Sequence, residues 1–196
     1  SYYTVTNPTP DTTVACGIIA AYVVTTPLFH IANTAPVGGR NIFLDTLKLR
    51  VTIAPASGIN AIYTIDTDST TRLSTAPTGG SNRTINNVRA DRGNDAEAQV
   101  WAFTGGTVLT VMAASSARTI AHGAIAHSIP IAHDELCLAF GQDVVGSSPA
   151  TAVTRRVASP PPVIIPPQTS ASIHIYFVSN AATGLSAEYE LGFWQR

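Results

Sequence analysis

Charged residues are scarce in this sequence. Asp, Glu, Lys and Arg make up 12% of its 196 residues, about half the share of a typical globular protein. Eleven basic residues against twelve acidic ones give a formal net charge of −1, and every basic residue except Lys48 is an arginine. The hydrophobic share of 45% is too high for an intrinsically disordered chain. A general nucleic-acid binder is disfavoured, because neutralising phosphates needs a surplus of basic charge.

Cysteines and long apolar runs are also few. Cys16 and Cys137 cannot form a disulfide framework and have no zinc-type spacing. We expect two small buried thiols, with a single bridge between them as the open alternative. The longest apolar run, 14–24, has eleven residues, too few to cross a bilayer as a helix. No cationic segment precedes it, so we expect a soluble protein that is not exported by a signal peptide.

Helical periodicity is missing, and alternation of the kind found in strands takes its place. The run from Phe43 to Ile53 alternates with period two between Gly38-Gly39 and Pro55, which predicts a strand. One face of this strand would carry Phe43, Asp45, Leu47, Leu49, Val51 and Ile53. Two further strands are predicted over Ile59–Ile65 and Leu136–Phe140.

Two segments near the end of the chain, Ser172–Ser179 and Ser186–Trp194, flank turn-forming residues and predict an antiparallel hairpin. Many short strands separated by turn residues are typical of a sandwich or barrel. We therefore expect an all-β fold: a single antiparallel β-sandwich domain, jelly-roll-like, over residues 14–196. Residues 1–13 are polar and contain two prolines, so we expect an extended N-terminal arm.

No pattern of catalytic or metal-binding residues stands out. His122, His127 and His133 fall close together, but none of the spacings used by zinc sites is present. There is no G-x-S-x-G nucleophile elbow. His174 is expected on the polar face of its strand, and His30 has no partner nearby in the sequence. We expect no enzyme activity, no cofactor and no metal.

The C-terminal strand is the most informative segment. With Tyr189 and Leu191 facing inward, Glu188, Glu190 and Trp194 face outward. Tryptophan and arginine are enriched at protein interfaces, so one interpretation places Trp194 and Arg196 in a contact between subunits. In that contact Arg155 and Arg156 would pair with the outward glutamates. The other interpretation is that Trp194 covers the end of its own core.

A second segment, Thr67–Val88, is long and polar. Connections of this length in a compact domain tend to be functional or to lie against a partner. It contains Asn82-Arg83-Thr84, which matches the acceptor sequence for N-glycosylation. Without a secretory signal we interpret that match as coincidence.

Several of these residues resemble small virion proteins of tailed bacteriophages. That family shows a V-I-P-P step, a strand with alternating histidine, and a closing pattern E-x-E-x-G-W-W-x-R. Here the corresponding segments are 163–167, 170–179 and 187–196, with Phe193 in place of one aromatic. The resemblance extends over about residues 59–196 and is weaker before them.

The resemblance implies a β-sandwich protein of the virus particle, with capsid decoration, or cementing, as its role. Its partners would be the major capsid protein and further copies of itself, as a homotrimer, with no nucleic acid and no membrane. It would be made in the host bacterial cytoplasm and reside on the phage capsid surface.

Two alternatives come from other classes of protein. The chain could be a receptor- or carbohydrate-binding jelly-roll module of a phage tail or fibre. It could also be a metal-dependent β-barrel enzyme that uses the histidines at 122, 127 and 133.

Overall fold

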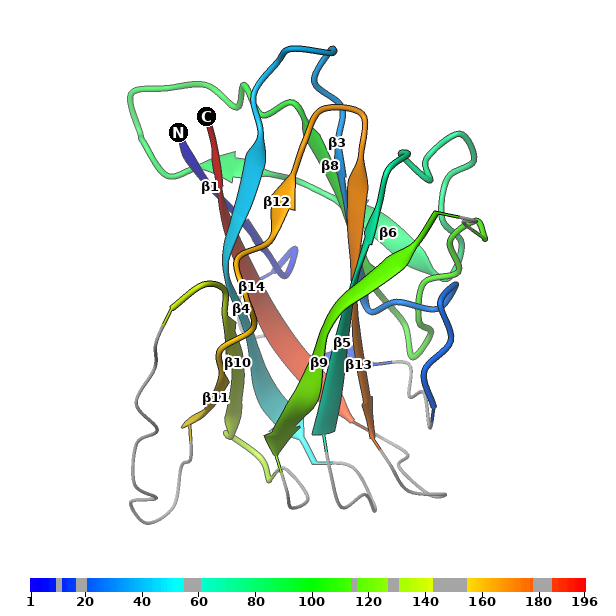
Figure 1. Ribbon diagram of the computed structural model, residues 1–196. Helices are drawn as coiled ribbons and strands as arrows, with labels where there is room; N and C mark the ends of the chain where they lie inside the picture. The colour runs from blue at the N-terminus through cyan, green and yellow to red at the C-terminus, as the bar shows by residue number, and fades with distance from the viewer. Residues whose placement is uncertain are drawn as a thin grey trace.

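The protein consists of two β-sheets packed face to face (Figure 1). The computed structural model describes residues 1–9, 12–16, 21–54, 61–113, 116–126, 131–142, 155–177 and 185–196. Across those residues the regular elements are all strands, and no helix is long and apolar enough to cross a membrane. The expected all-β sandwich is confirmed.

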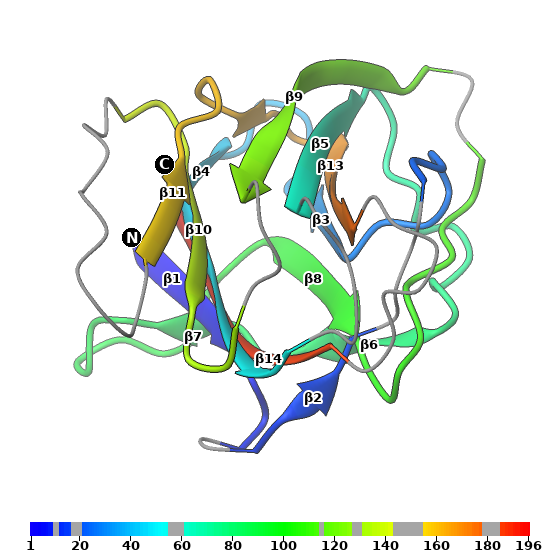
Figure 2. The ribbon, with the colours of Figure 1, turned by 90° about the horizontal axis from the view of Figure 1, so that it is seen from below.

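We name the two sheets A and B, and Figure 2 shows them from one end of the sandwich. Sheet A has eight strands. Along the sheet they are β11 (Arg155–Ala158), β10 (Glu135–Ala139), β4 (Ile42–Ile53), β14 (Ser186–Gln195), β1 (Tyr2–Thr6) and β7 (Asn86–Asn87), with β12 (Ile164–Ile165) beside β4 and β2 (Val14–Ala15) beside β14. All pairs are antiparallel except β10 with β11.

Sheet B has six strands, all antiparallel. In spatial order they are β6 (Gly80–Arg83), β8 (Ala98–Phe103), β3 (Phe29–Asn33), β13 (Ser170–Phe177), β5 (Ala61–Asp68) and β9 (Arg118–Ala126). The predicted strands at Phe43–Ile53, Ile59–Ile65 and Leu136–Phe140 correspond to β4, β5 and β10. Residues 59 and 60 lie outside the described residues.

The predicted C-terminal hairpin is wrong. β13 pairs with β3 and β5 in sheet B, whereas β14 pairs with β4 and β1 in sheet A. Both strands therefore take central positions, and their apolar faces fill the core from opposite sides. Consecutive strands that cross between the sheets are typical of jelly-roll sandwiches.

The predicted N-terminal arm is wrong over residues 2–6. β1 pairs with β14 from Tyr2↔Trp194 to Thr6↔Glu190, and Tyr3 and Val5 are fully buried. The alternation of Tyr3 and Val5 with threonines fits a strand that has one face in the core. The polar composition of the first residues therefore reflects the outer face of a sheet.

A β-bulge shifts the two faces of β4. Gly192 of β14 pairs with Thr46, but the next residue, Phe193, pairs with Leu44, so Asp45 has no opposite residue. Ile42 and Leu44 are consequently buried before the bulge, and Leu47, Leu49 and Val51 after it. Phe43 and Asp45, predicted on the same face as Leu47, lie instead on the outer face of sheet A.

Aromatic side chains join the two sheets in the core. The Phe29 ring of sheet B packs edge-on against Tyr189 of sheet A, with 5.2 Å between ring centroids. Phe103 lies 5.6 Å from Phe29 in the same manner, and Tyr3 stacks on Phe193 at 5.5 Å. Cys16 and Cys137 are both buried and free, as expected.

Candidate interaction surface

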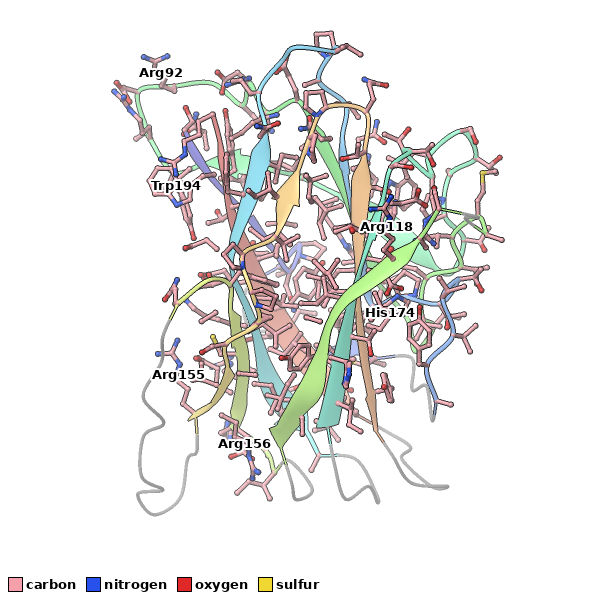
Figure 3. The ribbon with its side chains drawn as sticks, in the orientation of Figure 1. Arg92, Arg118, Arg155, Arg156, His174 and Trp194 are labelled. Atoms are coloured by element: carbon pink, nitrogen blue, oxygen red, sulfur yellow. The ribbon has the colours of Figure 1, made fainter. Side chains whose placement is uncertain are left out.

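The outer face of sheet A carries the residues that the sequence singled out at the end of the chain. Along β14 the side chains of Tyr189, Leu191 and Phe193 are buried, whereas Trp194 is 44% exposed. Figure 3 shows Trp194 directed away from the sandwich. The predicted alternation of this strand is therefore confirmed.

Strand pairing extends Trp194 into a row of apolar side chains. Phe43 lies opposite Trp194 on one side, and Tyr2 lies opposite it on the other. Ile164, which is 48% exposed, follows beside Phe43. We call these four residues the aromatic strip. It crosses β12, β4, β14 and β1, and the Tyr2 and Trp194 ring centroids are 4.8 Å apart.

A close approach of two strands positions Tyr2 in the strip. A Cβ atom at Gly192 would lie 2.0 Å from the Tyr2 hydroxyl oxygen, so only glycine leaves room for this ring. The Tyr2 hydroxyl donates to Oδ2 of Asp45 at 3.0 Å, and the amide of Gln142 donates to the other carboxylate oxygen at 3.2 Å. The bulge at Asp45 thus supplies the acceptor that fixes the ring beside Trp194.

Beyond the aromatic strip, the outer face of sheet A carries three ion pairs. Lys48 Nζ lies 2.9 Å from Oε1 of Glu190, and this hydrogen bond raises the pKa of Lys48. Arg50 pairs with Glu188. Arg155 Nε lies 2.8 Å from Oε1 of Glu135. We call these six residues the charge ladder, because cations and anions alternate from strand to strand.

The pairing of Arg155 and Arg156 with the outward glutamates was expected between subunits and stays a prediction, because within the chain these arginines have other partners. Arg156 Nη2 lies 3.1 Å from Oδ2 of the buried Asp134, and Arg155 pairs with Glu135 on the neighbouring strand. The partners of Glu188 and Glu190 come instead from β4, which lies directly opposite β14. Strand order decides these partners.

Arg196 lies at the edge of the aromatic strip. Its guanidinium carbon is 5.0 Å from the centroid of the Phe43 ring, within the range of a cation–π contact. Sequence reasoning found Trp194 and Arg196 but missed Tyr2, Phe43 and Ile164. The alternation of Tyr2 and Thr4 with buried neighbours was the available signal for Tyr2.

The outer face of sheet B is polar as well, but its central part is enclosed, whereas residues of β9 such as His122 are exposed. We call six of its residues the sealed polar cluster, and all are at most 3% exposed: His30, Asp66, Asp68, Arg72, Ser172 and His174. Figure 3 shows His174 on the side of the molecule opposite Trp194.

Two short contacts link histidines into this cluster. His174 Nε2 lies 3.0 Å from Oδ2 of Asp66, and His30 Nδ1 lies 2.9 Å from the Ser172 hydroxyl. No partner for His30 could be predicted from the sequence, because Ser172 is 142 positions away in the chain. Tyr22 covers the pair formed by Asp66 and His174 by donating to Asp66 at 2.7 Å.

The cluster favours neutral His30 and ionised Asp66. Burial, with Arg72 nearby, lowers the pKa of His30 to about 3. Burial alone would raise the pKa of Asp66, but hydrogen bonds from His174, Thr119 and Tyr22 lower it below its ordinary value. Because Tyr22 donates to Asp66, this buried network holds the segment around Tyr22 against the outer face of sheet B.

Two of the three histidines noted at 122–133 lie in the described residues. His122 is exposed on β9, and His133 is exposed in the turn before β10 with a φ of 73°. His127 lies outside the described residues. Within the part of the chain that the structure describes, no three His, Cys, Asp or Glu side chains are placed to hold a metal ion.

Comparisons with protein-family models, with curated proteins and with solved structures found no match. The resemblance to small virion proteins therefore stays a prediction, and function is argued from the surface. What the structure adds is a physical role for the positions of the C-terminal pattern. The glutamates bind cations of β4, Gly192 admits Tyr2, Phe193 fills the core, and Trp194 with Arg196 belongs to the outer face.

Proposed function

We propose that this protein is a structural subunit that binds its neighbours through the outer face of sheet A. The observation that carries the proposal is the aromatic strip, a continuous row of partly exposed apolar side chains across four strands. Its most specific form is the one that the sequence resemblance implies: a decoration, or cement, protein on the outside of a phage head, arranged as a homotrimer.

The strip has the composition of an interface centre. Tryptophan and tyrosine dominate the binding energy of measured interfaces, where they occupy the buried middle of the contact. Leaving their apolar surface wet costs about 25 cal/mol per Å², so covering Trp194 and Ile164 with a neighbour is favourable. The gain is available without rearrangement, because strand pairing and the Tyr2–Asp45 hydrogen bond already fix the rings.

The charge ladder suits the rim of the same contact. Interfaces surround an apolar centre with polar groups that remain partly hydrated. The ladder presents both signs of charge, and its cations and anions are already paired within the chain. A partner therefore meets a surface with little net charge, which fits a chain whose formal charge is −1.

A cement protein needs a large contact area and many repeated contacts, and it needs no catalytic activity. A stable contact buries about 800 Å² per partner, and many identical contacts on one lattice act together. The aromatic strip and the charge ladder lie together on the described outer face of sheet A, so one side of the molecule carries the whole proposed contact.

The proposal is tested on assembled heads of the phage that encodes the chain. Heads stripped of this protein are mixed with increasing amounts of the purified chain, and bound copies are counted by quantitative gel densitometry and cryo-electron microscopy. We expect saturation at a copy number that matches the icosahedral lattice, with density on the outer shell. Failure to bind heads, or binding that never saturates, would overturn the proposal.

A matched pair of variants connects that experiment to the strip. Trp194→Ala removes the largest exposed side chain of the strip, and Val37→Ala removes one that is 89% exposed in a turn outside it. Occupancy at sub-saturating concentration should fall at least tenfold for the first variant and stay unchanged for the second. Equal occupancy of the two variants would remove the strip from the account.

A further inference from the structure

A polar cleft lies at the edge of the sandwich where β6 of sheet B approaches β1 and β7 of sheet A. Its volume is about 490 Å³, within the range of about 300–1,000 Å³ that small-molecule sites occupy. Its lining residues are Thr6, Asn7, Pro8, Asn82, Arg83, Thr84 and Asn86. The aromatic strip contributes none of them.

Arg83 is the charged residue of this lining, and its charge has no counter-ion among the described residues. Its Nη2 donates to the backbone carbonyl of Phe103 at 3.0 Å, and its guanidinium carbon lies 5.9 Å from the centroid of the Tyr189 ring. Its Nε is buried and has no hydrogen-bond partner in the described part of the chain. A partly buried cation without a counter-charge is costly, so an anion beside it would be stabilising.

The ring beneath Arg83 belongs to Tyr189, a core residue that is not among those lining the cleft. The Tyr189 hydroxyl is buried and, across the residues that the structure describes, has no hydrogen-bond partner. Burial raises the pKa of Tyr189 to about 12, although Arg83 acts to lower it. The hydroxyl therefore keeps its proton at neutral pH and remains a donor.

The rest of the lining offers neutral groups that suit hydroxyls. Asn82, Thr84 and Asn86 are exposed, and in the described structure no hydrogen bond occupies their side chains. Amides and hydroxyls both donate and accept, as recognition of a polyhydroxylated ligand requires. Asn7, by contrast, is engaged within the chain: its side chain accepts from the Tyr189 backbone N–H at 2.7 Å and donates to the Thr12 carbonyl at 2.9 Å.

We propose that this cleft binds a hydroxylated carboxylic acid of monosaccharide size, an acidic sugar of the hexuronate type. A carboxylate beside Arg83 would accept from the guanidinium donors that remain, since Nη2 already donates to the Phe103 carbonyl. A single cation matches its single negative charge better than the nearly double charge of a phosphate. The asparagines and Thr84 then hydrogen-bond the ring hydroxyls.

The test measures binding of glucuronate to the purified full chain by isothermal titration calorimetry. Glucose is the control without charge, and acetate is the control without hydroxyls. Glucuronate should bind saturably and at least tenfold more tightly than either control. Binding of acetate as tight as that of glucuronate would show a site for any carboxylate and would overturn the assignment to a sugar, as would the absence of glucuronate binding.

Three variants locate the site. Arg83→Gln should weaken glucuronate binding at least tenfold. Asn82→Ala, at an exposed position where the fold is not at risk, should weaken glucuronate several-fold without changing the response to acetate. Arg118→Gln is the matched control, because Arg118 lines a different cavity, of about 240 Å³. Unchanged affinity in both cleft variants, or equal loss in the control, would contradict the proposal. The experiment needs no phage heads, so its outcome is independent of the proposed cementing role.

Discussion

The two outer faces of the sandwich use charged residues in opposite ways. On sheet A, the side chains of Lys48 and Glu190 are 34% and 43% exposed. On sheet B, those of Arg72 and Asp68 are 2% and 0% exposed, with Arg72 Nε 2.8 Å from Oδ2 of Asp68. Both contacts are ion pairs of nearly equal length, but only the first is in contact with water.

This difference in exposure indicates that buried charges beside sheet B stabilise the fold, whereas exposed charges on sheet A are available for binding. An exposed ion pair contributes about 0–1 kcal/mol, so the outer face of sheet A can gain or lose partners without disturbing the fold. A buried pair behaves differently, because removing one member leaves the other charge buried and uncompensated. Removing one member of the buried pair beside sheet B should therefore lower the stability of the fold more than breaking an exposed pair on the outer face of sheet A.

The largest expected effect is the loss of the buried pair. Arg72→Met keeps most of the side-chain volume but leaves Asp68 without its cation, and should lower the free energy of unfolding by about 3–5 kcal/mol. Arg72 also donates to the carbonyls of Val24 and Met112, so the segments around these two residues should loosen as well. Urea denaturation followed by circular dichroism measures the change.

The matched substitution on the other face is Lys48→Met, which breaks the exposed pair with Glu190 and should cost at most about 1 kcal/mol. Similar costs for the two substitutions would show that the faces do not differ in the way described.

The next effect is a loss of stability in acid, caused by His30. Its pKa is lowered to about 3 in the folded protein from 6.5, so below pH 6.5 the unfolded chain binds a proton that the folded chain does not. Stability should be lost as the pH falls from 6.5 towards 3, with a slope of about 1.4 kcal/mol per pH unit for one proton. Asp66, whose pKa lies below 3.8, should add to the loss only under more acid conditions.

Chemical denaturation at a series of pH values tests this prediction. Between pH 6 and pH 4, His30→Gln should reduce the slope of the unfolding free energy against pH by about 1.4 kcal/mol per pH unit, because the amide cannot titrate. His122→Gln, at an exposed position on β9, should leave the slope unaltered. The same slope in the wild type and in His30→Gln would show that the sealed polar cluster is not the origin.

A smaller effect is expected at Gly192, under the aromatic strip. Gly192→Ala places a methyl group where the Tyr2 hydroxyl lies, and overpacking of this kind costs about 1–3 kcal/mol. In a Tyr2→Ala background the clash disappears, so the same substitution should cost less than half as much. A double-mutant cycle from urea denaturation measures this coupling, and additive costs would mean that Tyr2 is not held over Gly192.

Local patterns predicted the strands well and their partners poorly. Side chains alternate across a strand wherever it sits in the fold, so the alternation in β14 and in β4 beyond its bulge could be predicted. Which strand lies beside which depends on packing between distant segments. β13 and β14 were therefore predicted as a hairpin, although they lie in different sheets.

For the same reason, the residues of the outer face of sheet A could be predicted only in part. Trp194 and the outward glutamates follow from alternation within one strand. Phe43 lies in the aromatic strip because the bulge at Asp45 turns it to the outer face. Tyr2 lies there because β1 pairs with a strand almost two hundred positions away. The alternation of Tyr2 and Thr4 could have placed Tyr2 on an outer face, but it does not name the strand beside it. The bulge has no local signature, and it reverses every side chain beyond it.

The central claim is that the aromatic strip joins subunits, and sedimentation velocity tests it most directly. The wild type should remain trimeric at micromolar concentration, and Val37→Ala should behave identically. Trp194→Ala should shift to monomer, because interface anchors of this kind contribute about 2 kcal/mol or more per contact, while its circular dichroism spectrum stays that of the wild type. A monomeric wild type, or a Trp194→Ala variant that stays trimeric, would contradict the account and leave Trp194 as a cover for its own sheet.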